Sequence, residues 1–318
     1  MKRTRINGLL GIDYPILQGG MLWIADAGLA AAVSNAGALG IISPLAGMER
    51  HGHASENLRE QIDRARGLTE KPFGVNIPLD LRDSGILIDT LLKERVEIVV
   101  TAAGDPGAFT GLLRHEKIKV LHVVSSVRQA RIAEASHVDA VVVEGVEAAG
   151  HIGFDELPLF SLIPQVVDAV SVPVIAAGGI ADARGLVAAF SLGAEGVQLG
   201  TRFVPVVENI ASPAYKRAII EAGDSDTIIT CRRLLPARSL KTEFSKRLSA
   251  LEERGASAEE IREFLGYGRP RKSQLEGDLA EGEAYCGTSA GLIKDIVPAA
   301  TVIEQLVKGY QEVIKRIS

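Results

Sequence analysis

Two glycine turns in the middle of the chain have the composition of a phosphate-binding site. Gly178 and Gly179 follow one short apolar run, and Gly200 and Thr201 follow the next. Glycine lets an oxygen-rich ligand approach bare backbone N–H groups, and a helix that begins after such a turn adds a favourable dipole. In (β/α)8 barrels, the loops after the last two strands hold phosphate in this way. The spacing therefore predicts a phosphorylated ligand at the rim of a barrel.

A histidine among small residues follows an earlier apolar run. His151 lies in the segment 150–153, just beyond the run that ends at Glu144. Barrel enzymes keep catalytic groups at this end of their strands, and an imidazole with an unperturbed pKa near ~6.5 suits proton transfer at neutral pH. We therefore predict a catalytic His151 rather than a loop histidine bonded to backbone. His122, inside another apolar run, is a weaker candidate for facing the barrel and its ligand.

Other polar or glycine residues end three of the apolar runs. Gly20 and Met21 follow the first run, where they either present a backbone amide to a flat ligand or form a tight turn. Asn76 lies amid apolar residues, and since an unpaired buried amide costs ~1–3 kcal/mol, we favour a ligand over neighbouring backbone as its partner. Glu144 follows valines, and a buried carboxylate must be paired, protonated or bound to a ligand.

Eight short apolar runs alternate with stretches of helical periodicity. The candidate site residues lie within or follow these runs, so the runs must position them. The runs are nearly continuous in Val and Ile, as in strands of a parallel sheet that is buried on both faces. Eight repeats within one domain-sized stretch favour a closed TIM (β/α)8 barrel over an open doubly wound sheet. The predicted strands are 15–17, 39–43, 73–77, 98–102, 119–124, 140–144, 173–177 and 196–199. Predicted helices include 25–35, 55–66, 127–135 and 183–192.

The pattern changes in the last third of the chain, where the residues become more charged and mostly helical. We assign residues 1–203 and 288–318 to the barrel, and residues 204–287 to a helical insertion that covers its C-terminal mouth. An independent C-terminal domain is the alternative. It is disfavoured because a barrel needs an eighth helix, which the predicted helix 289–317 supplies.

Local signals within and beside the insertion lead to further predictions. One strand is predicted at 227–230, and Ser257 with Glu260 forms a capping box that begins a helix. The basic segment 269–272 is predicted to be a loop. Its charges and Arg202 are expected to be solvated rather than part of the site.

Composition limits the class of protein. The chain has 318 residues, 47% of them hydrophobic, and a net charge of −5 without a basic stripe, so we expect no nucleic-acid partner. No apolar run reaches the roughly 18 residues of a membrane span, and no signal peptide is evident. Cys231 and Cys286 are too few for a disulfide framework or a metal site. We expect a cytoplasmic enzyme that acts on a small-molecule substrate and forms a homo-oligomer, most simply a dimer.

Five ordered segments resemble the nitronate monooxygenase (2-nitropropane dioxygenase) family. That family also includes flavin-dependent enoyl-ACP reductase II enzymes and related NADH:quinone reductases. The segments are 15–21, 71–76, 144–153, 176–180 and 198–203, and the similarity continues through 285–291. The resemblance implies that FMN binds noncovalently in a TIM barrel beneath a smaller helical domain.

The resemblance also implies roles for individual residues. The residues that would hold the FMN phosphate are Gly178, Gly179, Gly200 and Thr201. The residues that would line or approach the isoalloxazine ring are Gly20, Met21, Asn76, Glu144 and Gln198. His151 matches the catalytic histidine of the family, and Trp23 is expected beside the rim of the flavin because it follows Met21 closely.

The activity that the resemblance implies first is oxidation of alkyl nitronates with O2, through His151 and the flavin. The alternative is an enoyl-ACP (enoyl thioester) reductase II or an NADH:quinone reductase with NAD(P)H as co-substrate. Many nitronate monooxygenases have glutamine in place of Glu144 and arginine in place of Ile152, so this chain is closer here to the reductase branch. An IMP dehydrogenase-like barrel would need a cysteine where His151 stands. A noncatalytic barrel that binds a phosphorylated ligand is a remote alternative.

Overall fold

Eight parallel strands form the centre of the protein. In this computed structural model, which describes residues 1–48 and 53–317, they pair in the order β1-β9-β8-β6-β5-β4-β3-β2. A parallel bridge between Leu17 and Leu39 joins the two ends of this order, so the sheet closes as the predicted TIM barrel. The barrel strands are β1 Ile16–Gln18, β2 Gly40–Ile42, β3 Phe73–Pro78, β4 Ile98–Ala102, β5 Lys119–Val124, β6 Ala140–Glu144, β8 Val174–Ala177 and β9 Gly196–Leu199.

The side chain of Gln18 completes the seam between β1 and β2. Its Oε1 accepts a hydrogen bond from the Ile41 N–H at 3.0 Å, and its Nε2 donates to the Ile41 carbonyl at 3.2 Å. A carboxamide offers the same donor and acceptor as a peptide group, so Gln18 extends the pairing beyond the single Leu17–Leu39 bridge. The fully buried Gln18 therefore helps to close the barrel.

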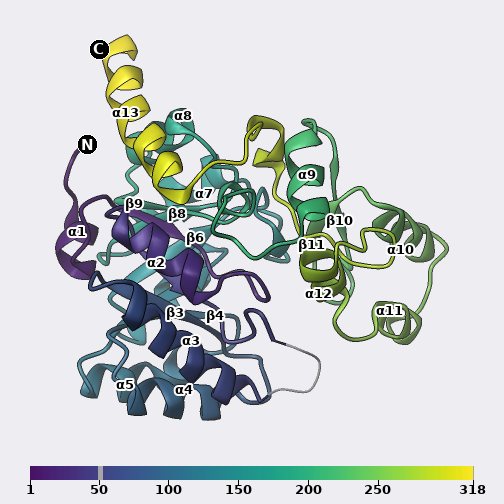
Figure 1. The fold of residues 1–318 in the computed structure, drawn as a ribbon, viewed down its shortest axis with the longest axis horizontal. Helices are drawn as coiled ribbons and strands as arrows, with labels where there is room; N and C mark the ends of the chain where they lie inside the picture. The colour runs from purple at the N-terminus through teal and green to yellow at the C-terminus, as the bar shows by residue number, and fades with distance from the viewer. Residues whose placement is uncertain (49–52, 318) are drawn as a thin grey trace.

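Helices cover the outside of the barrel (Figure 1). They are α2 Ala27–Asn35, α3 Ala54–Leu68, α4 Ser84–Lys93, α5 Gly107–His115, α6 Val127–Ala135, α7 Leu159–Val167, α8 Ala183–Ser191 and α13 Ala299–Ile317. The last of these, α13, lies beside α8 and supplies the expected eighth helix. A Cβ atom at Gly309 would lie only 2.8 Å from the Ala183 Cβ, so glycine permits this close packing.

The final helix begins later than the sequence predicts. A short 3-10 helix, η3 Thr288–Leu292, is followed by an extended segment in which Val297 bridges Val206. Pro298 then precedes α13, which begins at Ala299. Proline is favoured where a helix starts and lacks the N–H that a helix interior requires, so it sets this boundary.

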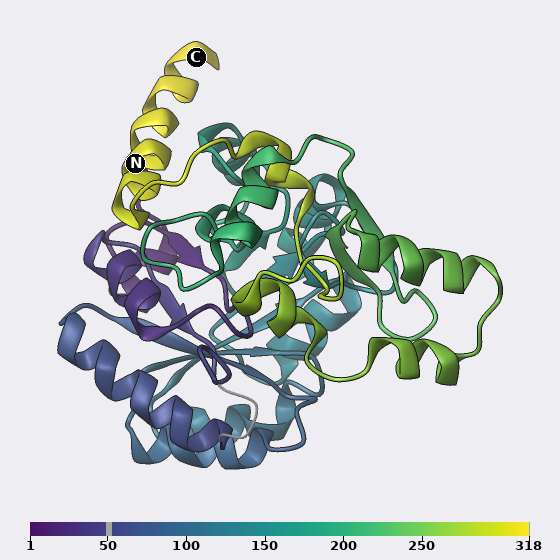
Figure 2. The same cartoon turned by 45° about the vertical axis from the view of Figure 1, so that its right-hand side comes forward.

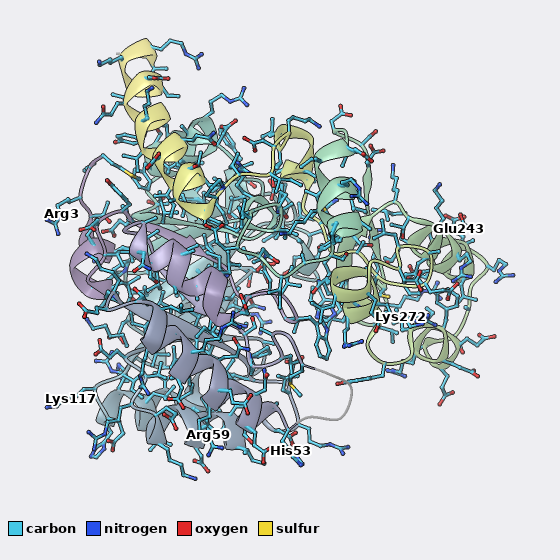
Figure 3. The ribbon with its side chains drawn as sticks, viewed as in Figure 1. Arg3, His53, Arg59, Lys117, Glu243 and Lys272 are labelled. Carbon is cyan, nitrogen blue, oxygen red and sulfur yellow. The ribbon has the colours of Figure 1, made fainter. Side chains whose placement is uncertain are left out.

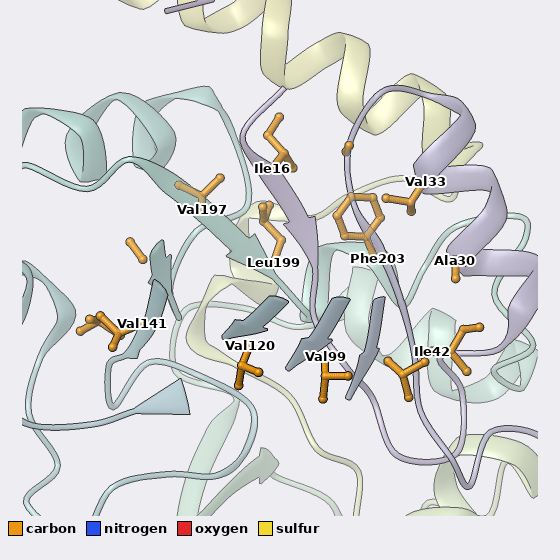
Figure 4. Packing of buried hydrophobic residues seen from close by; sticks show 14 of the residues in the cluster. Ile16, Ala30, Val33, Ile42, Val99, Val120, Val141, Val197, Leu199 and Phe203 are labelled. Carbon is orange, nitrogen blue, oxygen red and sulfur yellow. The ribbon is translucent and has the colours of Figure 1, made fainter. Parts of the chain in front are cut away.

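Alternating side chains of each strand build two apolar layers. In β6, Val141 and Val143 face the helices in the main cluster, part of which Figure 4 shows packed around the strands. Ala140 and Val142 instead face the inside of the barrel. Helix α1, Arg5–Leu10, adds Ile6 and Leu10 to the inner cluster. It therefore closes the end of the barrel at which the strands begin.

The insertion between β9 and α13 contains more strand than the sequence predicts. Its elements are α9 Pro213–Glu221, β10 Thr227–Thr230, β11 Ala237–Leu240, α10 Glu243–Glu253, α11 Ala258–Leu265, α12 Arg269–Arg271 and the π-helix η2 Lys272–Glu276. The predicted strand β10 is present, but it pairs antiparallel with β11, for which no strand was predicted. β11 pairs in turn with β7, Gly150–His151, from the segment after β6. Residues 204–287 are therefore not mostly helical.

The segment 269–272 is helical rather than a loop, and its first arginine is not solvated. The Arg269 guanidinium donates to the carbonyls of Phe264 and Leu265 and stacks over the Phe244 ring. It thereby satisfies carbonyl groups at the end of α11, which lack partners within their own helix. The predicted Ser257–Glu260 capping box at the start of α11 is confirmed.

The insertion packs against the ends of the barrel strands. Figures 1 and 2 show α9 to α12 gathered beside the barrel while α13 returns to its outer wall. One buried cluster contains barrel-loop residues Trp23, Met48 and Val204 together with Tyr215 and Cys286, which lie beyond the barrel strands. Because Trp23, Met48 and Val204 follow β1, β2 and β9, the cluster lies at the C-terminal mouth.

Charged side chains are distributed over both parts of the surface. Arg3, Arg59 and Lys117 lie at the edge of the barrel in Figure 3, and Glu243 and Lys272 lie on the insertion. Among the described residues, no helix combines the length and the apolar character that crossing a membrane requires.

Candidate active site

Three polar side chains point into the barrel at its C-terminal mouth. Glu144 on β6 has the same orientation as the inward-facing Val142, two residues earlier. Gln198 on β9 alternates with the outward-facing Val197 and Leu199. Asn76 on β3 likewise lies between two outward-facing residues. The side-chain alternation of strands therefore gathers Asn76, Glu144 and Gln198 into one inward-facing set.

None of these three side chains makes a hydrogen bond to another described residue, and Gln198 Oε1 is fully buried without a partner. The turn after β1 packs directly on two of them. A Cβ atom at Gly20 would lie 2.6 Å from Asn76 Cβ, and one at Gly19 would lie 3.2 Å from the Gln198 side chain. Glycine is therefore needed here for packing on these side chains, in addition to any ligand contact.

Backbone amides at the predicted phosphate turns are free of protein acceptors. Among the described residues, the N–H groups of Gly178, Gly179, Gly200 and Thr201 donate no hydrogen bond. The Met21 N–H likewise donates to no described residue, although the Met21 carbonyl accepts from Ile24 and Ala25. Five unpaired donors at one end of a barrel suit an anionic or carbonyl-bearing ligand.

The glycines of these turns have different conformations and surroundings. Gly178 and Gly179 have φ values of +101° and +69°, which strain other residues. A Cβ atom at Gly179 would meet Glu147 Cβ at 3.2 Å, so it would be directed at protein rather than at a bound phosphate. A side chain at Gly179 would thus disturb the loop after β6 rather than occupy the position of the phosphate. Gly200, in contrast, has no atom within 4 Å of the position of its absent Cβ.

A third segment ties the turns together from the end of the insertion. The Gly287 N–H donates to Thr201 Oγ1 at 3.0 Å, and the Thr288 N–H donates to the Glu147 carbonyl at 3.0 Å. A Cβ atom at Gly287 would lie 2.7 Å from that same carbonyl. The turn after β9 and the loop after β6 are thereby linked through residues that lie far apart in the sequence.

Glu144 is half-buried at the mouth, and no cationic side chain among the described residues forms an ion pair with it. Desolvation raises the pKa of its carboxyl group to about 8. The group is therefore protonated at neutral pH, when it can donate one hydrogen bond and accept others. A glutamine amide has the same capacity, so Glu144 provides hydrogen bonds similar to those of the glutamine that many nitronate monooxygenases have here.

We expect Glu144→Gln to change the pH dependence of stability. In the unfolded chain the Glu144 carboxyl group ionises near the ordinary glutamate pKa of 4.5, whereas in the folded protein it holds its proton up to about 8. Between these values the folded state binds more protons, so the free energy of unfolding falls as pH rises. The free energy of unfolding of Glu144→Gln does not fall in this way, because the variant has no carboxyl group at this position. Its apoprotein should therefore melt at least ~2 °C above wild type at pH 9 but not at pH 5.

The matched control for this prediction is Glu304→Gln, on the exposed face of α13. It should not reproduce the pH-dependent difference in melting temperature. Equal melting of wild type and Glu144→Gln at both pH values would show that Glu144 ionises normally in the folded protein.

His151 belongs to a short strand, which the sequence analysis did not predict. Gly150 and His151 form β7, which pairs with Arg238 and Ala237 of β11. The Ile152 N–H then donates to the Pro236 carbonyl at 2.9 Å. The insertion therefore holds the backbone of the histidine that the sequence predicts to be catalytic.

The imidazole of His151 is exposed and contacts Tyr285. The distance from Nε2 to the Tyr285 hydroxyl is 3.4 Å, and the two rings meet edge to face with centroids 5.7 Å apart. Desolvation by the surrounding protein lowers the pKa of His151, and the charge of Asp80 opposes that change. His151 is therefore mainly neutral at pH 7, which suits a group that accepts a proton.

Other predicted candidates lie outside this arrangement. His122 shares the outward face of β5 with Val120 and Val124, where its Nδ1 lies 2.7 Å from Thr101 Oγ1. It faces the helices, and burial lowers its pKa to about 4. Arg202 is buried and paired with Asp295 at 2.8 Å, so the prediction that it is solvated is wrong.

Trp23 lies at the mouth but is buried among protein side chains, with 6% of its surface exposed. Its contact with the flavin rim stays a prediction. Tyr285 lies beside His151, but the sequence analysis did not predict a role for it. It appeared there only within the segment 285–291 that resembles the family. A long-range pairing brings Tyr285 beside His151, and no local pattern signals that pairing.

The site as a whole fits a flavin mononucleotide. Unpaired amides at the ends of β8 and β9 suit its phosphate, and open space lies beside Gly200. The unpartnered amide and carboxyl side chains inside the mouth suit the carbonyl and N–H groups of a flavin ring. Fold and site together define a TIM-barrel protein whose C-terminal mouth can hold a flavin, with a histidine beside that mouth.

Comparisons with known proteins identify the family. The family profile of nitronate monooxygenase matches residues 3–89 and 82–309, so the chain belongs to this family. A probable nitronate monooxygenase of Staphylococcus saprophyticus is 32% identical over 98% of this chain and 99% of its own length. The (3aS,4S,5R,7aS)-5-hydroxy-7a-methyl-1-oxo-octahydro-1H-indene-4-carboxyl-CoA dehydrogenase of Mycobacterium tuberculosis is 36% identical over 80% of this chain and 71% of its own length.

Two solved structures superpose over nearly the whole chain. FabK from Thermotoga maritima has a TM-score of 0.93 and 42% identity, and the match covers 100% of this chain and 99% of FabK. Nitroalkane oxidase from Streptomyces ansochromogenes has a TM-score of 0.83 and 28% identity, and the match covers 99% of this chain and 100% of that protein. The resemblance stated from the sequence segments is thus confirmed.

Proposed function

We propose that this protein is an FMN-dependent reductase that uses NAD(P)H to reduce the carbon–carbon double bond of an enoyl thioester. The identity of 42% with FabK (enoyl-ACP reductase II) supports the reductase branch of the family. The carboxyl-CoA dehydrogenase, at 36% identity, is a second relative whose name indicates a thioester substrate. The N–H groups at Gly178, Gly179, Gly200 and Thr201 would hold the FMN phosphate. Met21, Asn76, Glu144 and Gln198 would hydrogen-bond the ring.

The observation that carries the choice of substrate is the charge beside His151. The charged group that alters the pKa of His151 is the Asp80 carboxylate, and Ile152 stands where many nitronate monooxygenases have arginine. A nitronate is an anion, and a carboxylate near the reacting atoms repels it. An enoyl group is neutral and experiences no such repulsion. The electrostatics therefore favour an enoyl thioester.

The bound flavin would supply hydride transfer, and the chain would supply orientation and a proton. His151, with Tyr285 at 3.4 Å, would relay a proton from solvent to the carbon next to the thioester carbonyl, because an exposed neutral imidazole can accept a proton at one ring nitrogen as it gives one from the other. The insertion would exclude water from the mouth, as its buried contacts with Trp23 and Met48 suggest. Glu144 would stay neutral beside the ring.

Oxidation of alkyl nitronates is the second candidate. It is favoured by the family match and by the probable nitronate monooxygenase that matches the full length of the chain. In that reaction the neutral His151 would accept the proton next to the nitro group when a neutral nitroalkane enters, and this step forms the nitronate. A homo-oligomer, most simply a dimer, stays a prediction for either activity.

Anaerobic mixing of the FMN-loaded protein separates the two candidates. We expect NADH or NADPH to bleach the flavin absorbance near ~450 nm, and crotonyl-CoA to restore it. Propionate 3-nitronate should leave the absorbance unchanged. Bleaching by the nitronate, with no bleaching by either nicotinamide, would contradict the proposal and favour the second candidate. A protein that binds no flavin would contradict both.

A further inference from the structure

One strand of the insertion holds both His151 and Tyr285. Ala237 and Arg238 of β11 pair with β7, and the next residue, Ser239, bridges Tyr285 on an antiparallel segment. The Cys286 N–H donates to the Arg238 carbonyl, which extends this pairing. His151 and Tyr285 therefore lie along the same edge of β11. The edge-to-face contact of their rings follows from the backbone pairing.

The backbone around Tyr285 is held from several sides. Gly150, with φ +74°, lies against the tyrosine ring, because a Cβ there would be 3.4 Å from Cδ2. The Tyr215 hydroxyl of α9 donates to the Tyr285 carbonyl. The Ser273 hydroxyl donates to the carbonyl of Glu283 at 2.6 Å. The segment is therefore a rigid support for its side chains.

A buried carboxyl group lies behind the tyrosine. Glu283 precedes Tyr285 by two residues on the extended segment, so the two side chains leave the backbone on the same side. Glu283 is 5% exposed, and its Oε1 has no hydrogen-bond partner among the described residues. A buried carboxylate oxygen without a partner is costly, and the electrostatic influence of Glu283 reaches the Tyr285 phenol. Glu283 therefore influences the same Tyr285 phenol whose hydroxyl lies 3.4 Å from His151 Nε2.

We propose that Glu283, acting through the Tyr285 hydroxyl, determines which ring nitrogen of His151 carries the proton. This inference rests on the proposed function, in which His151 moves a proton. Tyr285 and Glu283 are positioning residues in this account, because they act through His151 and need not contact the substrate.

The reason lies in the single proton of a phenol. When Glu283 is ionised, the phenol donates to the carboxylate, and the phenol oxygen accepts from Nε2–H of His151. When Glu283 is protonated, it donates to the phenol oxygen, and the phenol donates to Nε2, which leaves the imidazole proton on Nδ1. The only proton gained or lost is that of Glu283, and the direction of both hydrogen bonds reverses with it.

Tyr285 and Cys231, which lie near Glu283, each keep one protonation state around neutral pH. Burial raises the pKa of Glu283 to about 7, and it raises the pKa of Tyr285 well above 10, so the phenol stays protonated. Burial raises the pKa of Cys231 to about 12, and the nearby charges of Glu283 and Glu252 act in the same direction. The further charged or titratable neighbours are Asp80 beside His151, Tyr215 and Cys286 near Tyr285, and Arg238 near Cys286.

The test is nitrogen-15 NMR of histidine side chains in the FMN-loaded protein between pH 6.5 and 8.5, with His151→Ala identifying the His151 signals. In wild type we expect Nε2 to change from an unprotonated to a protonated shift as pH rises through about 7. Glu283→Gln, which keeps shape without a carboxyl proton, should remove the change. Tyr285→Phe, which keeps the ring, should also remove it. Tyr310→Phe, a matched change against Phe190 on the outer wall, should retain it.

Steady-state kinetics give a second readout. Both Glu283→Gln and Tyr285→Phe should lower kcat about tenfold, leave KM within about twofold, and remove the inflection near pH 7 from the rate profile. A wild-type tautomer change in either folded variant would overturn the inference. The proposed function fails independently if His151→Ala keeps full activity, and that result would leave the tautomer measurement in Glu283→Gln and Tyr285→Phe unaffected.

Discussion

Replacing His151 by alanine is expected to lower kcat for enoyl thioester reduction by ~10²–10⁴ while the protein keeps its FMN. The imidazole at the mouth is exposed and mainly neutral, and removing it removes the group that moves the proton in the proposed reaction. Its side chain makes no contact with the turns at Gly178 or Gly200 among the described interactions. Cofactor binding should therefore be independent of it.

The measurements are kcat by NAD(P)H consumption and FMN content by absorbance after gel filtration. His115→Ala is the matched control, because His115 is exposed on α5 beside Glu116, at the surface of the barrel. It should retain full activity. Full activity of His151→Ala would remove the histidine from the mechanism, whereas loss of FMN from that variant would mean that His151 supports the pocket.

Replacing Gly200 by valine is expected to weaken FMN binding strongly without unfolding the protein. Gly200 has a φ of −103°, which valine adopts readily, and the direction of its absent Cβ is open for 4 Å. The new side chain would occupy that space and separate the phosphate from the N–H groups of Gly200 and Thr201. Losing two charge-assisted hydrogen bonds of ~1.5–3 kcal/mol each raises the dissociation constant at least ~100-fold.

Fluorescence titration of the apoprotein with FMN measures this effect, and thermal unfolding of the apoprotein checks the fold. Gly67→Val on the exposed end of α3, where no atom lies within 4 Å of the Cβ position, is the control. A Gly179→Val variant should differ from both. Its φ of +69° and its contact with Glu147 predict a loss of stability as well as of FMN. Normal FMN affinity in Gly200→Val would exclude the phosphate from this turn.

The barrel was predictable because its signals are local. Each strand is a short run of apolar residues, and the predicted and observed bounds of β4, β5, β6 and β9 coincide. A parallel strand between two layers must be apolar on both faces, so this pattern appears in the sequence without knowledge of its partners. The helix cap at Ser257 is equally local, since a capping box needs only four consecutive residues.

The insertion was less predictable because its pairings are remote. β11 has the sequence Ala-Arg-Ser-Leu, which carries little strand signal, and it becomes a strand by pairing with β10 and β7. Arg269 and Arg202 looked like surface charges. Their guanidinium groups are instead bound by carbonyl groups at the end of α11 and by Asp295, respectively. A sequence does not record which distant groups satisfy a charge.

The sequence by itself determined the alternation of strands and helices, the glycine turns that leave backbone N–H groups unpaired, and the presence of an imidazole near the mouth. Each of these depends on residue type and on neighbours within a few positions. Only the tertiary structure decided that Asn76, Glu144 and Gln198 all point into the barrel at its C-terminal mouth. It also decided that β11 brings Tyr285 beside His151. Such relations depend on strand register and closure across long separations, and these are set when the whole chain buries its apolar surface together.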